Sequence, residues 1–298
     1  MVALQKCLIT MFKLVLCLYL IPVTSFSQTI KYRQYKSGEV STYKLTSEVY
    51  RNEKFSGKTV SIAQLKVVKD TEFFSEEISW LSKVSSTGKD TINFDSLARK
   101  VKPYKISLSP EGEVLLPKLT IPEVVGDITD LNTFFVAVAP ALNIQKLSLK
   151  NKSFINDKPI QGNFADSIVI LYGTDCIQVA QNLLAAAKDY VIVETKFTPP
   201  LSFCLDPLFD TITKKSFEQF NNIQMIQKSI DGKLNLLWGV ENFTIITRIN
   251  SKSGKILNAR MNNFLNLRMR YNSSQDLKTY TIEMPVTIKR IVELELLK

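Results

Sequence analysis

The chain contains no histidine, which removes most of the familiar nucleophilic and metal-centred chemistries. Ser-His-Asp and Cys-His systems need an imidazole base, and histidine is the commonest ligand of transition metals. Carboxylates could still act as acid and base, but only as a pair facing each other across a cleft. Glu76 and Glu77 point to opposite faces of an expected strand, and Asp127 and Asp130 flank an expected helix start, where capping explains them. We therefore predict no enzyme, no cofactor and no metal site.

Two of the four cysteines remain once an expected N-terminal leader is removed. They are Cys176 and Cys204, an even number in a compartment where disulfides form. A bridge between them would close a loop of about 29 residues and would contribute ~3–4 kcal/mol by the chain-entropy estimate. We predict a disulfide, with two separately buried thiols as the alternative.

One polar array has regular spacing. Arg260, Arg268 and Arg270 fall on one parity of an expected strand and could contact phosphate, sulfate or carboxylate groups. The alternative is a wet outer face neutralised by glutamates on the next strand, Glu283 among them. The chain has no dense Lys/Arg run with interleaved aromatics, so nucleic-acid binding has no support.

Residues 1–27 have the features of a cleavable export signal. Lys6 and Lys13 precede an apolar run of about ten residues, and Ser25 and Ser27 supply the small residues needed before cleavage. The formal charge of +10 includes those two lysines, which leaves +8 after cleavage. A moderate basic excess suits contact with anionic envelope components such as lipid headgroups.

A lipid-modified Cys17 is the alternative to cleavage, but Leu16 stands where such a motif needs a small residue. After the leader, the richest apolar run covers only 134–142, well short of the about 18 residues of a membrane-spanning helix. We therefore expect a mature chain, 28–298, without a transmembrane helix. It would lie in the periplasm, at the periphery of the outer membrane or outside the cell.

The pattern beyond residue 256 determines the expected fold class. Apolar and polar residues alternate over 257–271 and resume over 280–288, which is typical of long antiparallel strands with one buried face. We predict a mainly β protein, with a long curved sheet or a partly open barrel. Two short packed helices are expected, at about 130–140, capped by Asp130, and at 175–188. A polar interval at 148–162 would be the seam if the domain has two halves.

These features favour an exported, non-enzymatic β-rich protein. Its curved sheet would bind an apolar or amphipathic ligand, such as a lipid, or an envelope partner. A scaffold or complex subunit with a filled core is the alternative. A carboxylate-dependent glycan hydrolase is a weaker alternative, because no acidic pair is placed by spacing alone.

Overall fold

The computed structural model describes residues 30–69, 73–88, 90–167, 170–208, 215–216, 218–229 and 231–297. The predicted export signal, 1–27, lies outside these residues. Within the described ranges, no helix has both the length and the apolarity to cross a membrane.

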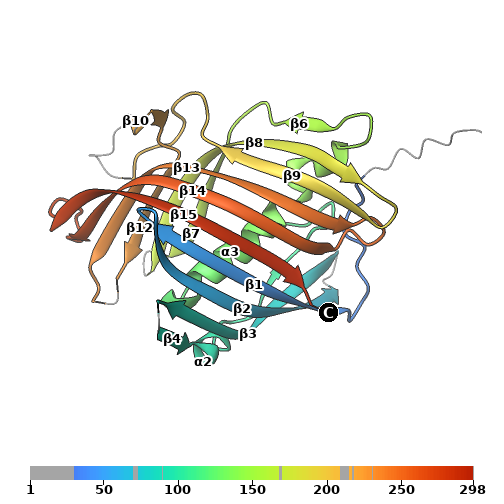
Figure 1. Ribbon diagram of the computed structural model, residues 1–298, viewed down its shortest axis with the longest axis horizontal. Helices are drawn as coiled ribbons and strands as arrows, with labels where there is room; N and C mark the ends of the chain where they lie inside the picture. The colour runs from blue at the N-terminus through green and yellow to red at the C-terminus, as the bar shows by residue number, and fades with distance from the viewer. Residues whose placement is uncertain are drawn as a thin grey trace, which may run out of the picture.

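One 13-stranded antiparallel sheet forms most of the protein and curves around a helix (Figure 1). Its main path of hydrogen-bonded neighbours is β12 (Ile223–Lys228), β8 (Leu171–Ala186), β9 (Tyr190–Thr198), β13 (Leu234–Asn250), β14 (Ile256–Ser273), β15 (Ile282–Leu296), β1 (Val40–Arg51), β2 (Lys54–Lys69), β3 (Phe74–Thr87) and β4 (Asp90–Asn93), and β12 also pairs with β13. Outside this path, β5 (Tyr104–Ile106) pairs with β3, and β6 (Ser153–Ile155) and β7 (Ile160–Ser167) pair with β8. A separate two-stranded ribbon joins β10 (Lys215–Ser216) and β11 (Gln219–Phe220).

The predicted fold class is confirmed. Strand β14 is 18 residues long, and it buries Met261, Leu265 and Leu267 on one face while Arg260 and Asn262 are exposed on the other. Among the described strands, β4 and β5 at one edge do not pair with β6 and β7 at the other. The sheet is therefore curved and open rather than a closed barrel.

The alternation predicts a buried face for one stretch that the structure leaves exposed. Tyr280, Ile282 and Met284 are 43%, 49% and 37% exposed. Strand β1 pairs with β15 only from Ile288 onward, so this end of β15 has β14 as its only neighbouring strand in the described sheet. A strand that runs past the packed layer keeps its period of two but has nothing to bury its apolar side against.

Helix α3 (Val125–Val136) confirms the helix predicted near 130–140, although it begins five residues earlier. It follows a short 3-10 turn, η1 (Pro122–Val124), whose first residue is a proline, a residue suited to that position. In Figure 1, α3 runs behind β1 and β15, inside the curve of the sheet. Its Ile128, Leu131 and Phe134 join the main core with side chains of the sheet.

The other helical elements are short. They are α2 (Asp95–Ala98), η2 (Pro140–Leu142) and η3 (Ile144–Lys146). Helix α2 follows β4 and buries Ala98. The alternation of the sheet strands gives no sign of this single turn.

The helix predicted at 175–188 is wrong, because these residues belong to strand β8. Ile177, Val179 and Leu183 are buried at a period of two, whereas Leu184, expected on the buried side of the helix, is 52% exposed. Alanine and leucine favour a helix locally, but β8 has strands on both of its edges. Tertiary pairing therefore overrides the local preference.

The interval 148–162 contains β6 and the start of β7, and both pair with β8. They lie end to end along one edge of that strand: β6 pairs with 180–182, and β7 with residues from Ile177 down to Leu171. The interval is thus part of the continuous sheet. A division of the domain into two halves stays a prediction.

Strands β9 and β12 share one position in the sheet, between β8 and β13. Thr198, the last residue of β9, pairs with Gln178, and β12 resumes in the same direction with Ile223 opposite Asp175. The chain leaves the sheet after β9 and returns to the same line at β12. Residues 199–222 form this excursion.

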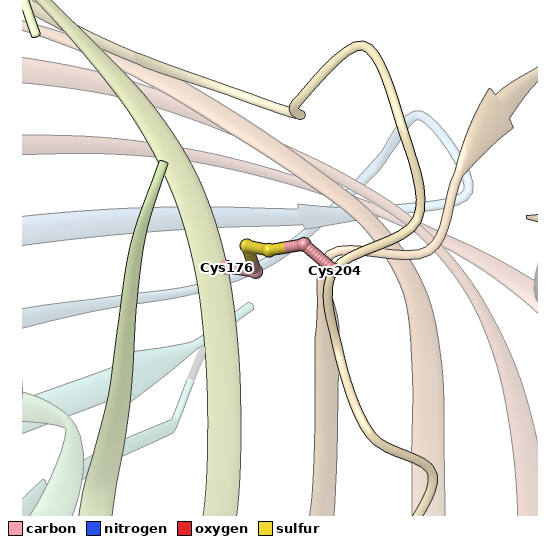
Figure 2. The surroundings of a disulfide bond; sticks show 2 residues. All are labelled: Cys176 and Cys204. Atoms are coloured by element: carbon pink, nitrogen blue, oxygen red, sulfur yellow. A yellow bond between two sulfur atoms is a disulfide. The ribbon is translucent and has the colours of Figure 1, made fainter. Parts of the chain in front are cut away.

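The predicted disulfide is confirmed, and it lies where the excursion begins. Cys176 of β8 stands between the last contact of β9 and the first contact of β12, and its backbone N–H donates to the carbonyl of Asn222 at 2.8 Å. Its sulfur is bonded to Cys204 of the excursion, with the two Cα atoms 6.3 Å apart (Figure 2). The bridge ties the excursion to β8, next to the edge of the sheet.

Replacing both bridged cysteines by alanine should lower the free energy of unfolding by ~3–4 kcal/mol, because the unfolded chain loses the closed loop. Urea unfolding of the native protein and of Cys176→Ala/Cys204→Ala measures this difference. A reductant should lower the midpoint of the native protein and leave the double variant unchanged. A difference below about 1 kcal/mol between the two proteins would contradict a stabilising role for the bridge.

Candidate functional site

A cavity of about 570 Å³ lies between helix α3 and the concave face of the sheet. The helix presents two faces: Leu131 and Phe134 pack into the core, whereas Thr129, Thr133 and Val136 line the cavity. Most of the remaining wall is apolar and includes Leu116, Ile177, Met225, Met261 and Leu265. Only one side of the helix is therefore sealed against the sheet.

One row of side chains crosses five strands along the cavity wall. Successive cross-strand partners place Val179 of β8 beside Phe197 of β9, then Phe243 of β13, Asn263 of β14 and Arg290 of β15. All five line the cavity. The two phenylalanine rings are stacked, with centroids 4.3 Å apart. The row therefore runs from an aliphatic and aromatic end to a polar end.

Two buried aspartates on α3 fix the helix to the sheet. Asp127 accepts hydrogen bonds from Lys83 Nζ and Ser61 Oγ, and these two residues are direct cross-strand partners on β3 and β2. Asp130, one turn further along, accepts both of its bonds from the guanidinium of Arg290 on β15. The helix is thus held at β2 and β3 on one side and at β15 on the other.

The predicted capping role of Asp127 and Asp130 is wrong. Both lie inside α3, and the N-cap residue is Val124, which makes no side-chain capping bond. The helix begins earlier than the apolar spacing indicates, because η1 leads directly into it. Burial raises the pKa of Asp130, and the Arg290 guanidinium opposes that shift.

Two further carboxyl groups line the cavity, from different strands. Glu241 of β13 accepts a hydrogen bond from Asn263 Nδ2 at 2.6 Å. Burial raises its pKa, and the bond from Asn263 and the field of Arg290 oppose the shift. Burial and the neighbouring Glu241 also raise the pKa of Asp175 on β8, to about 7. Glu241 and Asp175 keep partial solvent exposure, so a molecule in the cavity could reach them.

The sequence analysis did not identify the cavity residues Asp175, Glu241, Asn263 and Arg290. Asn263 carried a usable signal, since it is a polar residue on the apolar parity of its strand, between Met261 and Leu265. A polar residue on a buried face needs a polar partner. Glu241 is that partner, and only the pairing of β13 with β14 brings the two residues together.

The three arginines predicted to contact anions lie away from this cavity, and each meets a carboxylate of β15. Arg260 pairs with Glu293. Arg268 and Arg270 both pair with Glu283, at 3.3 and 2.7 Å. These contacts are the cross-strand neutralisation considered as the alternative. Anion binding at this face stays a prediction.

Arg270 differs from the other two arginines because it is only 8% exposed. Its guanidinium lies over the rings of Trp238 and Tyr280, at 5.2 and 4.5 Å from their centroids. Cation–π contacts of this kind stabilise a partly buried arginine. This arrangement gives Arg270 a structural role near the C-terminal end of β14.

No protein-family model and no curated protein matches the chain. Among solved structures, the chain is similar to one described as "Lipid-protein interactions in lipovitellin", with a TM-score of 0.43 and 12% sequence identity. The match covers 89% of this chain and 26% of that chain, so this chain spans about a quarter of its length.

Removing one partner of a buried ion pair leaves an uncompensated charge, so Asp130→Asn should cost about 3–5 kcal/mol of unfolding free energy. The exposed pair of Arg260 with Glu293 supplies the matched control, and Glu293→Gln should cost about 0–1 kcal/mol. Urea unfolding of both variants measures the difference. Equal losses would show that Asp130 does not anchor α3.

The raised pKa of Asp175 gives a pH dependence of defined sign. Its folded pKa of about 7 exceeds the ordinary value of 3.8 for an exposed aspartate. Its full contribution to stability is therefore present below pH 3.8 and is lost as the pH rises towards 7. Asp175→Asn should remove this loss. Unfolding free energies of the two proteins, measured across this range, should diverge in favour of the variant as the pH rises. Parallel curves would contradict the assigned pKa.

Proposed function

We propose that the protein is an exported, non-enzymatic binding protein that holds an apolar or amphipathic ligand between α3 and the curved sheet. The cavity carries this proposal. Its volume of about 570 Å³ lies within the roughly 300–1,000 Å³ typical of sites for small molecules. Its wall combines a largely apolar lining with a few polar groups at one end, the usual composition of such sites.

The fixed position of α3 supports the same proposal. Ion pairs at Asp127 and Asp130 hold the helix while its cavity side is left unpacked. A helix that only completed a core would close this space, since protein interiors pack densely. The retained space is best explained by an occupant, such as the acyl part of a lipid from the cell envelope.

The disulfide supports export, because such bonds form and persist in oxidising compartments. The periplasm, the periphery of the outer membrane and the cell exterior all meet this condition for a bacterial protein. The basic character of the chain suits an anionic envelope surface as the place where the ligand is taken up or delivered.

A carboxylate-dependent hydrolase is the second candidate, and one observation favours it. Asp175 and Glu241 lie in the same cavity and interact electrostatically. Two carboxyl groups that share one cleft are the usual equipment of glycan hydrolysis. The apolar lining and the stacked phenylalanines are better suited to a lipid-like occupant than to a polar sugar.

Gly126 offers a direct test of the cavity as a binding site. It lies on α3 at the cavity wall, and a Cβ added to it would meet no other atom within 4 Å. Gly126→Phe adds a large side chain at the cavity wall and should weaken binding of the apolar fluorophore N-phenylnaphthylamine by about tenfold or more. Gly126→Ala is the matched control and should bind like the native protein.

Fluorescence titration measures the affinities, and thermal unfolding checks that both variants fold. Both should be at least as stable as the native protein, because glycine is unfavourable inside a helix. If the native protein binds no fluorophore and native mass spectrometry finds no co-purifying lipid, the scaffold interpretation would replace the binding function. If Gly126→Phe binds like Gly126→Ala, the ligand lies elsewhere. Turnover of glycan substrates that stops in Glu241→Gln would favour the hydrolase.

A further inference from the structure

Several hydrogen-bond donors that line the cavity are already used within the protein. The guanidinium of Arg290 is directed at Asp130, and Asn263 Nδ2 donates to Glu241. Asn132 Nδ2 donates to a backbone carbonyl at 3.0 Å. The hydroxyls of Thr129 and Thr133 donate to carbonyls of their own helix. A ligand that used these donors would have to break existing bonds.

Two hydrogen-bond acceptors that line the cavity, by contrast, have no partner within the part of the protein that the structure describes. Among the described residues, Asn263 Oδ1 and Asn132 Oδ1 are buried without a hydrogen-bond partner, and the two residues are only 2% and 4% exposed. Both line the cavity. A buried acceptor without a partner costs about 1–3 kcal/mol, so two on one wall are a specific feature that calls for a donor from outside the chain.

The charged groups around the cavity are also unbalanced, with more carboxyl groups than basic groups. No lysine or arginine in the described part of the chain forms an ion pair with Glu241 or Asp175. The two basic groups nearest to this region, Lys83 and Arg290, are engaged by Asp127 and Asp130 on α3. The cavity therefore has carboxyl groups in excess of cations, and this excess gathers on β8 and β13.

The polar and apolar groups are separated along the cavity. In the row across the sheet, Asn263 is the partner of Phe243, which stacks on Phe197, and Val179 follows. Asn263 Oδ1 and its bonded partner Glu241 lie beside this row, and Asp175 of β8 interacts electrostatically with Glu241. A molecule lying along this row would place its polar head there and its apolar tail over the phenylalanine rings.

We propose that the ligand is a single-chain amphiphile whose head is a protonated amine, with the ammonium group held by Glu241, Asp175 and Asn263 Oδ1. The proposal rests on the binding function argued above. An ammonium group supplies three donors and one positive charge, which match the surplus acceptors and the excess of carboxyl groups. Fatty acids, whose heads are anionic acceptors, would be rejected by the same groups.

Three probes with equal chains separate the head from the tail: dodecylamine, dodecanol and dodecanoate, each titrated against the native protein by calorimetry below its micelle concentration. Dodecylamine should bind at least about tenfold more tightly than dodecanoate, since hydrogen bonds to charged groups are worth more than neutral ones. If all three bind equally, the amine proposal is overturned while the binding function stands. If none binds, both fail.

Variants then locate the head group. Glu241→Gln and Asp175→Asn keep the size of each side chain and remove its charge. Each should weaken dodecylamine by about tenfold and leave dodecanol within about twofold. Glu293→Gln, a loss of charge at the exposed Arg260 pair, is the control and should change neither affinity. Unaltered dodecylamine binding in both cavity variants, with folding verified by thermal unfolding, would overturn the assignment of the site.

Discussion

The attachment of α3 to the sheet by two buried aspartates is the constraint on which the rest of the structure depends. Asp127 and Asp130 are three residues apart, so they lie on neighbouring turns of one helix face. Their partners come from strands on either side of β1: Ser61 and Lys83 from β2 and β3, and Arg290 from β15. Apolar packing alone is non-directional, whereas these contacts also define where the helix lies.

This fixed position explains why a cavity can persist. Separating the partners of a buried ion pair is costly. The two ion pairs therefore prevent α3 from moving towards the sheet and filling the cavity. The apolar face of α3 contributes to the core, and its cavity face is left open to a ligand. Arg290 belongs to both features, because it holds Asp130 and also forms the polar end of the row across the sheet. Arg290 therefore links the anchoring of α3 to the wall of the cavity.

The excursion at 199–222 places a second constraint on the same region. Strands β9 and β12 line the cavity with Phe197 and Ile223, and both are held between β8 and β13. The disulfide of Cys176 and Cys204 lies between these two strands and restrains the chain where it leaves the sheet. Restraint at this point keeps the split strand in register, and with it the cavity wall.

Spacing and composition were sufficient to predict the strand-rich class, the period of two along β14, the pairing of Cys176 with Cys204 and a helix near residue 130. Each of these depends on spacing or on a small set of alternatives within the chain. The sequence failed at 175–188, where the spacing of Ile177, Ala180 and Leu184 suits a helix while Ile177, Val179 and Leu183 suit a strand.

Tertiary pairing selects the strand pattern, because the strands on both edges of β8 hydrogen-bond with its backbone N–H and C=O groups. The cavity was beyond sequence reasoning for a related reason. Val179, Phe197, Phe243, Asn263 and Arg290 are far apart in the chain and become neighbours through the register of five strands. Register is determined by the packing of the whole sheet on α3, so a site that depends on it exists only once the chain is folded.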